Sequence, residues 1–261
     1  MNLETGKTAW FHWLLLLTCV WMPAGCKDPC EGVDCSGHGD CKVDKNDNAT
    51  CECDPGYENP FDTQTLCLCS SGNNIDNKPV IYLYPVETTR VQVAFAQPQT
   101  VELSYSYPAY PEGGWDVIAH PDGRLVDPVS GQLYYTLFWE GTVPQPPAPA
   151  EGFVVAGADT AAFLERSLAQ LGLSWEEADE FIIYWLPILG GNPYNFIQFA
   201  TTEYDRVVPL SVVPAPDTRI RISMKWRPLE QPPATLPAPQ IFNTPERRGF
   251  TLVEWGGTRL P

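Results

Sequence analysis

All nine cysteines of this 261-residue chain lie at or before Cys69, and none follows it. Closely spaced cysteines are typical of small extracellular domains that are held together by disulfides because they cannot build a large hydrophobic core. The cysteine-free remainder is long enough to bury a core of its own. The distribution therefore predicts two parts, a small cystine-rich module followed by a larger domain.

The N-terminus has the pattern of an export signal. Residues 9–22 form an apolar run that only His12 interrupts, and Lys7 precedes it. The run is shorter than the roughly 20 residues that a membrane-spanning helix needs, but it has the length of a signal-peptide core. We therefore expect residues 1–25 to be a signal peptide and the chain to be exported.

Cys26 stands directly after this run, behind Pro23, Ala24 and Gly25. The segment resembles the bacterial lipobox, which implies a lipid anchor on Cys26 and a place on the outer surface of the bacterial cell envelope. Pro23 departs from the motif, which usually has Leu, Val or Ile there. The alternative is ordinary cleavage near Gly25 and a soluble secreted protein. Cys26 would then bring the number of mature cysteines to an even eight, as four disulfides require, but its position favours the anchor.

The cysteine spacing over residues 26–69 resembles that of an EGF-like module. The resemblance includes the Cys51-Glu52-Cys53 pair and the Gly56-Tyr57 that follows it. It implies the disulfides Cys30–Cys41, Cys35–Cys51 and Cys53–Cys67, with Cys69 as the alternative to Cys67. Each disulfide would stabilise so small a module by roughly 2–4 kcal/mol. Zinc is a weaker explanation because the cysteines are not in CxxC knuckles, and we expect no metal or other cofactor.

Residues 70–78 are polar and rich in turn-forming residues, and they are predicted to be a linker. In residues 79–261, β-prone segments alternate between apolar and polar residues in the period of two that half-buried strands show. These segments are 78–85, 91–95, 101–107, 115–120, 132–139, 220–226 and 249–255.

Two helices are predicted within this β-rich domain, over 158–172 and 174–187. The second begins with a capping box of Ser174 and Glu177, and it carries an apolar stripe that includes Phe181 and Trp185. The connection between the helices is short, so we expect an antiparallel hairpin that lies on a sheet. The fold class expected is α+β, mostly antiparallel β with a helical hairpin.

Four segments of this domain, KPVIYLYP, FWEG, YWLP with NPYN, and TPERRGFTLVEWGG, resemble segments of an uncharacterised family of exported bacterial proteins. The resemblance covers most of residues 79–256. It implies a bacterial surface protein and brings no activity with it.

The sequence contains few groups that could carry catalysis. The formal net charge of −16 argues against nucleic acid as a partner. No motif of a serine hydrolase, zinc protease or phosphate-binding loop is present, and His120 is the one histidine after residue 78. Glu140 and Glu254 each stand beside a tryptophan at the end of a predicted strand. A carboxylate pair of this kind would hydrolyse glycosides if the two groups were roughly 5–9.5 Å apart.

Tyrosine and tryptophan are frequent in the large domain, and their flat rings with polar edges suit carbohydrate or peptide ligands. Those in irregular segments, Tyr107, Tyr110, Trp115 and Tyr194, are the candidates for exposed ligand contacts. A second candidate is the basic face of the strand over 219–227, which includes Arg219 and Arg221 together with Lys225 and Arg227. This face would contact an anion or pair with carboxylates on neighbouring strands, and we favour the pairing.

The function expected is that of a surface-anchored binding or adhesion lipoprotein without catalysis. The lipid on Cys26 would anchor the protein in the membrane, the EGF-like module would act as a spacer, and the large domain would bind carbohydrate or protein. The alternatives are a glycoside hydrolase-like enzyme using Glu140 and Glu254, and a structural component of the envelope.

Overall fold

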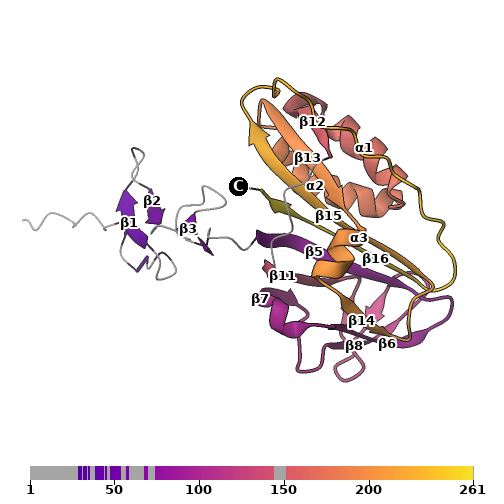
Figure 1. Ribbon diagram of the computed structural model, residues 1–261. Helices are drawn as coiled ribbons and strands as arrows, with labels where there is room; N and C mark the ends of the chain where they lie inside the picture. The colour runs from indigo at the N-terminus through magenta and orange to yellow at the C-terminus, as the bar shows by residue number, and fades with distance from the viewer. Residues whose placement is uncertain are drawn as a thin grey trace, which may run out of the picture. The chain divides into compact units, whose positions relative to one another are not determined.

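The computed structural model of the protein describes residues 29–30, 32–33, 35, 39–43, 45, 48–53, 57–58, 68–69, 74–143 and 151–260. The chain divides into two compact units between Cys69 and Ser70 (Figure 1). The predicted signal peptide, Cys26 and the proline-rich stretch 144–149 lie outside the described residues.

Two short antiparallel strand pairs form the described part of the N-terminal unit. β1 (Gly39–Val43) pairs with β2 (Ala49–Cys53), and β3 (Tyr57–Glu58) pairs with β4 (Leu68–Cys69). Disulfides join Cys30 to Cys41 and Cys35 to Cys51, each with a Cα–Cα separation of 5.7 Å. These are two of the pairs that the EGF-like resemblance implies.

The partner of Cys53 in the third disulfide of this unit remains a prediction. Cys53 is also disulfide-bonded, but Cys67 lies outside the described residues, so the choice between Cys67 and Cys69 is not made. The small core of the unit consists of disulfide cysteines, with Cys35 and Cys51 buried and Val33 packed against them. With so little apolar surface to bury, the disulfides take the place of a hydrophobic core.

The larger unit contains strands and three α-helices among its described residues. The strands are β5 (Asn74–Tyr84), β6 (Thr89–Phe95), β7 (Glu102–Tyr107), β8 (Trp115–Ala119), β9 (Leu125–Val126), β10 (Leu133–Tyr134), β11 (Leu137–Val143), β12 (Phe153–Ala156), β13 (Tyr194–Ala200), β14 (Leu210–Val213), β15 (Thr218–Leu229) and β16 (Thr251–Arg259). The helices are α1 (Thr160–Gln170), α2 (Trp175–Leu189) and α3 (Thr202–Val207).

These strands form two sheets within the described residues. A seven-stranded sheet has the order β12-β13-β15-β16-β5-β11-β7, and a five-stranded sheet has the order β10-β9-β8-β6-β14. Every pairing in both sheets is antiparallel except that of β15 with β16, which is parallel. The expectation of a mostly antiparallel β domain with a few helices is therefore confirmed.

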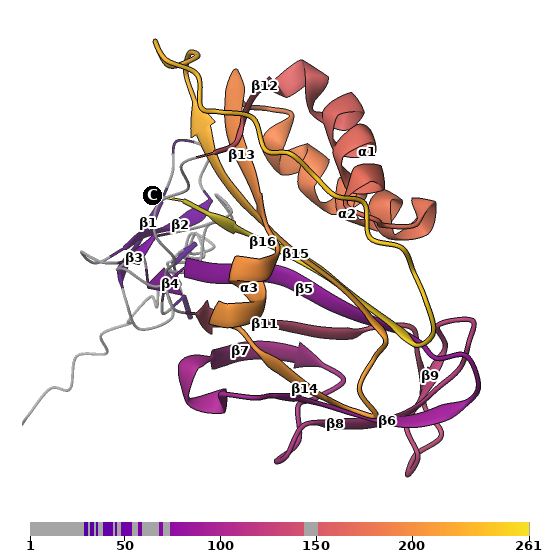
Figure 2. The same ribbon diagram turned by 45° about the vertical axis from the view of Figure 1, so that its right-hand side comes forward.

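The domain is built in three layers, with the seven-stranded sheet in the middle. One of its faces packs on the five-stranded sheet through a core that includes Leu83, Trp139 and Phe95. Its other face packs on α1 and α2 through a second core that includes Ile222, Phe181 and Trp255. Figures 1 and 2 show the two helices on one side of the sheet and β6, β8 and β14 on the other. Because both faces of the central strands are covered, these strands can be apolar on both sides.

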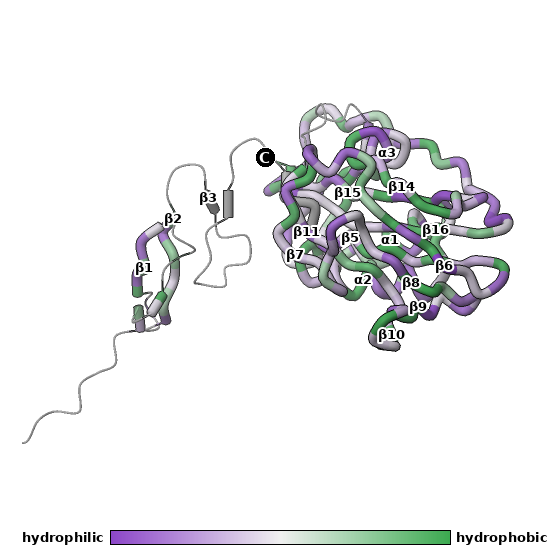
Figure 3. Tube along the Cα trace, turned by 90° about the horizontal axis from the view of Figure 1, so that it is seen from below, coloured by the Kyte–Doolittle hydropathy of each residue, from purple (hydrophilic) through white to green (hydrophobic). Residues whose placement is uncertain are grey.

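Hydropathy changes from residue to residue along several strands in Figure 3, which is the pattern of strands with two different surroundings. In β15, the residues Ile220, Ile222 and Met224 face the helices. The alternate residues Arg221, Ser223 and Lys225 are also buried, on the other face of the sheet. The predicted division of this strand into an apolar and a basic face is therefore correct. Arg221 and Lys225 in the middle of the basic face are buried, whereas Arg219 and Arg227 at its ends are exposed.

The two predicted helices form where their sequences indicate. In α2, Ser174 is the N-cap, and the capping box with Glu177 is present in full. The apolar residues Phe181, Trp185 and Leu189 are buried against the sheet and α1. Pro187 was expected to help end the helix, but it lies within the last turn, and the helix continues to Leu189.

Several elements differ from their predictions. β5 begins at Asn74, inside the stretch that was predicted to be a linker. The single strand expected over 132–139 is divided into β10 and β11, and α3 was not expected at all. β7 was expected to be half-buried, but it is the edge strand of its sheet, and Tyr105 and Tyr107 on it are exposed.

A long connection without regular strands joins the parallel pair β15 and β16. Figures 1 and 2 show it passing along the outside of α1 and α2 before β16 begins. The backbone of Gly152 donates to Ala238 in it, and Gln240 bonds both backbone groups of Phe199. Parallel strands need such a crossover because the chain must return to the end of the sheet at which β15 began. The crossover brings Arg247 next to the helices.

Candidate functional site

The two carboxylates of the hydrolase alternative lie on opposite faces of the seven-stranded sheet. Glu254 faces the five-stranded sheet, where Trp139 Nε1 donates to its Oε1 at 2.9 Å. Glu140 follows Trp139 in β11, so its side chain points the other way. It lies near Tyr184 of α2, and its Oε1 accepts a hydrogen bond from the backbone N–H of Lys78 at 3.1 Å. Two carboxylates separated by a sheet cannot flank one glycosidic bond.

Glu254 belongs instead to a buried network between the sheets. Its Oε2 pairs with Arg221 Nε, and its Oε1 also accepts from the Tyr204 hydroxyl at 3.2 Å. Arg221 and Glu254 are directly opposite in the parallel register, which is the cross-strand pairing that we favoured. Burial alone would lower the pKa of Arg221, but the Glu254 carboxylate, Tyr204 and Asp205 raise it above its ordinary value. The pair is a structural element and is not accessible to a ligand.

The environment of Glu140 is partly buried as well. Burial raises the pKa of its carboxyl group, while the Lys78 backbone N–H and charge lower it. Burial and the neighbouring Glu140 raise the pKa of Tyr184 to about 12. The Lys78 ammonium lies 4.9 Å from the centre of the Tyr184 ring. These contacts connect the start of β5 to the helical layer.

Two of the predicted ligand contacts are structural. Trp115 was expected to be exposed, but only 2% of it is accessible, because it packs in the core between the sheets and donates from Nε1 to the Pro108 carbonyl. Tyr110 packs against the Trp115 ring at 4.7 Å, and its hydroxyl accepts from the Phe95 N–H. The residues between the two rings, Pro111, Glu112 and Gly113, are exposed, but the rings themselves turn inward, so an irregular backbone was a poor guide to the accessibility of its aromatic side chains.

The remaining predicted contacts do not form one site. Tyr107 is exposed on the edge strand β7 and packs edge-on against Tyr134. Tyr194 is half-buried at the start of β13. Arg219 is exposed and donates to the Leu210 carbonyl, whereas Arg221 is buried.

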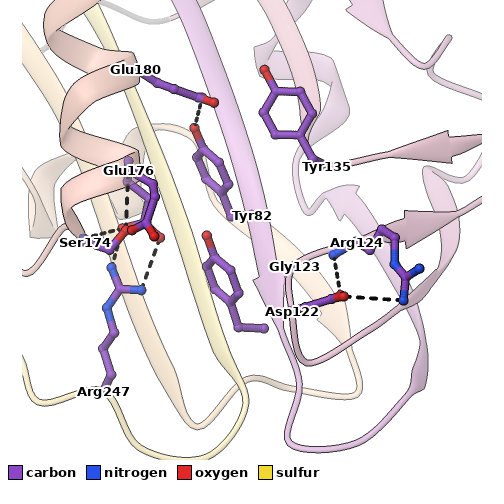
Figure 4. Close-up of a pocket in the computed structure, with 11 residues that line it drawn as sticks. Tyr82, Asp122, Gly123, Arg124, Tyr135, Ser174, Glu176, Glu180 and Arg247 are labelled. Carbon is purple, nitrogen blue, oxygen red and sulfur yellow. Dashed lines mark hydrogen bonds and ion pairs between the residues drawn. The ribbon is translucent and has the colours of Figure 1, made fainter.

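A cleft of about 430 Å³ lies on the helical side of the domain. Its walls are the first turns of α2, the end of β5, the turn before β9, the residue after β10, and the crossover before β16 (Figure 4). The described residues that line it are Tyr82, Tyr84, Asp122, Gly123, Arg124, Tyr135, Ser174, Glu176, Glu177, Glu180 and Arg247. None of the predicted contacts is among them.

Tyrosines from two segments form the aromatic part of the cleft. Tyr82 and Tyr84 are alternate residues of β5, and their rings stack with centres 6.3 Å apart and planes 5° from parallel. Tyr135 comes from the connection between β10 and β11, and 61% of it is exposed. In Figure 4 the hydroxyl groups of Tyr82 and Tyr135 both point toward the Glu180 end of the cleft. The Tyr82 hydroxyl donates to Glu180.

At the end of the cleft away from Glu180, an ion pair joins the start of α2 to the crossover. Glu177 caps the helix by accepting from the Ser174 N–H at 2.7 Å, and the same carboxylate pairs with the Arg247 guanidinium. Arg247 also donates to the Gly172 carbonyl, which follows α1. Its guanidinium lies 5.8 Å from the centre of the Tyr84 ring. One side chain therefore fixes both helices and the crossover around the cleft.

The opposite wall is the turn between β8 and β9. Its Gly123 has a φ of +85°, and an added Cβ there would lie 2.8 Å from the Tyr84 ring. Glycine is needed because of both the left-handed backbone and the close ring. Next to it, Asp122 accepts from the Arg124 N–H and pairs with its guanidinium at 3.4 Å. The turn over residues 120–123 thus forms one wall of the cleft.

The cleft keeps its tyrosines protonated. Burial raises the pKa values of Tyr82 and Tyr84, with further contributions from Glu180 and Glu177 respectively. Burial and Glu180 raise that of Tyr135 as well. The three phenols are therefore neutral hydrogen-bond donors and acceptors at ordinary pH. Together with the free carboxylate oxygens they can bind a polar ligand that has a flat face.

Comparison with known proteins adds no family to this description. No protein-family model matches the chain, and searches of curated proteins and of solved structures found no match. Among the described residues, no helix is long and apolar enough to cross a membrane. The same residues include no group of three or more His, Cys, Asp or Glu side chains that could hold a metal ion.

Proposed function

We propose that the protein is an exported bacterial lipoprotein that binds carbohydrate at the cell surface without catalysis. The lipid on Cys26 anchors it, residues 26–69 act as an EGF-like spacer, and the domain from residue 79 onward binds the ligand in the tyrosine cleft. The observation that carries the proposal is the juxtaposition of Tyr82, Tyr84 and Tyr135 with carboxylates in one cleft.

The chemistry of the cleft favours a sugar. Pyranose rings have an apolar face of C–H groups that packs on aromatic rings, and hydroxyl groups around the rim that donate to carboxylates and phenols. The volume of about 430 Å³ lies within the range of roughly 300–1,000 Å³ that is usual for small-ligand sites. The cleft is also built on a strand and a helix that are packed into the core, so it is formed before the ligand arrives.

Replacement of Tyr135 by Ala should weaken carbohydrate binding about tenfold, because it removes one aromatic wall. Tyr135 is largely exposed, so the variant should fold with unchanged thermal stability. The measurement is binding of the full mature chain to a panel of immobilised oligosaccharides that covers neutral, N-acetylated and amino sugars. Tyr105→Ala is the matched control, because Tyr105 is an equally exposed tyrosine outside the cleft. No binding to any sugar, or equal losses in both variants, would contradict the proposal.

The proposed lipid on Cys26 can be tested separately from ligand binding. Protein extracted from membranes should have an intact mass that begins at Cys26 and includes acyl chains. Seven cysteines then remain after Cys26, an odd number, so alkylation should also modify one thiol. A mass without acyl groups and without a free thiol would make Cys26 a disulfide partner and the protein a soluble secreted factor.

A further inference from the structure

The described residues that line the cleft carry more negative than positive charge. Its lining carries four carboxylates and two guanidinium groups, so its formal charge is 2 − 4 = −2. Arg247 pairs with Glu177, and Arg124 pairs with Asp122. Glu176 and Glu180 have no cation within ion-pair distance in the described part of the chain.

Glu180 is the better placed of these two groups. Its carboxylate accepts the Tyr82 hydroxyl, and Tyr135 lies across the cleft from it (Figure 4). A carboxylate has about four acceptor positions, so most of those on Glu180 remain for a ligand. The hydroxyl groups of Tyr82 and Tyr135 point toward this end of the cleft, so their oxygens can accept further hydrogen bonds from a ligand.

We propose that the carbohydrate of this cleft is an amino sugar, a glycan with free ammonium groups, one of which binds Glu180 between Tyr82 and Tyr135. The inference rests on the proposed function and specifies its ligand. An ammonium group supplies three hydrogen-bond donors and a positive charge, which together match a carboxylate flanked by two phenol oxygens. The sugar ring to which it is attached packs on the tyrosines.

The same geometry rejects an acidic glycan. An anionic sugar would face Glu176 and Glu180, while the two arginines that could attract it are already held by Glu177 and Asp122. The carboxylates of Glu176 and Glu180 would repel an anionic group in the cleft, and salt screens this repulsion only weakly there. A neutral sugar would leave the excess negative charge unmatched.

The test compares a glucosamine tetrasaccharide with its N-acetylated counterpart, which differs in having no ammonium groups. Calorimetric titration of the full mature chain at about pH 6, where the amines are protonated, should show binding of the amino form about tenfold tighter. Raising the salt concentration should reduce this preference. Oligolysine should bind more weakly than the amino sugar, because it supplies the ammonium without the ring.

Glu180→Gln should abolish the preference for the amino sugar, because the amide keeps an acceptor for Tyr82 and loses the charge. Glu176→Gln should reduce the preference in part, because the Glu176 side chain is exposed and makes no hydrogen bond to another side chain among the described residues. Glu165→Gln is the control, since it removes the same charge from the exposed surface of α1 outside the cleft. Unchanged thermal stability shows that each variant is folded.

The outcomes separate this inference from the proposed function. Equal binding of both tetrasaccharides with sensitivity to Tyr135→Ala would overturn the amino-sugar inference and leave the carbohydrate site standing. Oligolysine binding as tight as that of the amino sugar would overturn the inference by showing recognition of the ammonium alone. Binding of neither tetrasaccharide would overturn it as well, and the proposed function would fail if the wider sugar panel also gave no binding.

Discussion

Replacement of Arg221 by Met should destabilise the protein by about 3–5 kcal/mol. The substitution keeps most of the apolar volume of the side chain and removes the charge. It leaves the Glu254 carboxylate, whose side chain is 0% exposed, without its cationic partner. Chemical denaturation followed by tryptophan fluorescence measures the change, because Trp139 donates to the same carboxylate.

The size of the effect follows from the geometry around Arg221. Its Nη1 donates to Asp205 Oδ1 at 2.8 Å and to the Val208 carbonyl at 2.7 Å, so it also holds α3 and the residue after it against the sheet. The guanidinium lies 4.6 Å from the centre of the Tyr204 ring. Loss of Arg221 therefore removes hydrogen bonds from a buried carboxylate and from the backbone that follows α3.

Two further variants distinguish a buried pair from a general loss of packing. Arg221→Met combined with Glu254→Gln should recover part of the stability, because the second change removes the unmatched charge. Arg227→Met changes an exposed arginine of the same strand and should alter stability by less than about 1 kcal/mol. A loss below about 1 kcal/mol for Arg221→Met, or no recovery in the double variant, would show that the pair does not act as described.

Trp185→Ala should be about as damaging, with a loss of about 3–5 kcal/mol. Trp185 is 1% exposed, lies beside Phe181 of the same helix, and packs against Trp226 of β15 and Gly257 of β16. The missing side chain of Gly257 leaves room for the indole. An alanine would leave a cavity that the rigid sheet cannot close. The measurement is the free energy of unfolding in denaturant.

The control for Trp185 lies in the same helix. Ile183 is 73% exposed, and Ile183→Ala should change stability by no more than about 0.5 kcal/mol. Equal losses in the two variants would contradict the prediction, because they would show that the burial of Trp185 does not determine its contribution to stability. If Trp185→Ala also weakens sugar binding while Ile183→Ala does not, the position of α2 determines the shape of the cleft.

Local patterns in the sequence were good predictors of single elements. The capping box at Ser174 and the apolar stripe through Phe181 and Trp185 predicted α2 because both depend on residues a few positions apart. The alternation over 91–95 predicted β6 for the same reason. The chain divides into two compact units between Cys69 and Ser70, which is also where the cysteines of the sequence end.

The burial of Arg221 and the position of the cleft depend on pairing between distant segments and could not be predicted from the sequence. Arg221 has the pattern of a surface residue, and only its register opposite Glu254 explains its burial. The cleft residues Tyr82, Tyr135, Glu180 and Arg247 come from separate segments, and no spacing in the sequence relates them. The alternate tyrosines of the IYLY run and the arginine of TPERR were the available signals, but each is equally typical of core and surface.

The place of β16 in the sheet also affects how the chain is made. β16 is formed from residues 251–259, yet it lies between β15 and β5 in the interior of the seven-stranded sheet. During synthesis the sheet therefore cannot close until residue 259 has left the ribosome, and β5 and β15 have open edges until then. The seven-stranded sheet is therefore completed later than the five-stranded sheet, whose last strand along the chain is β14. The same delay would make the chain dependent on chaperones that cover open strand edges.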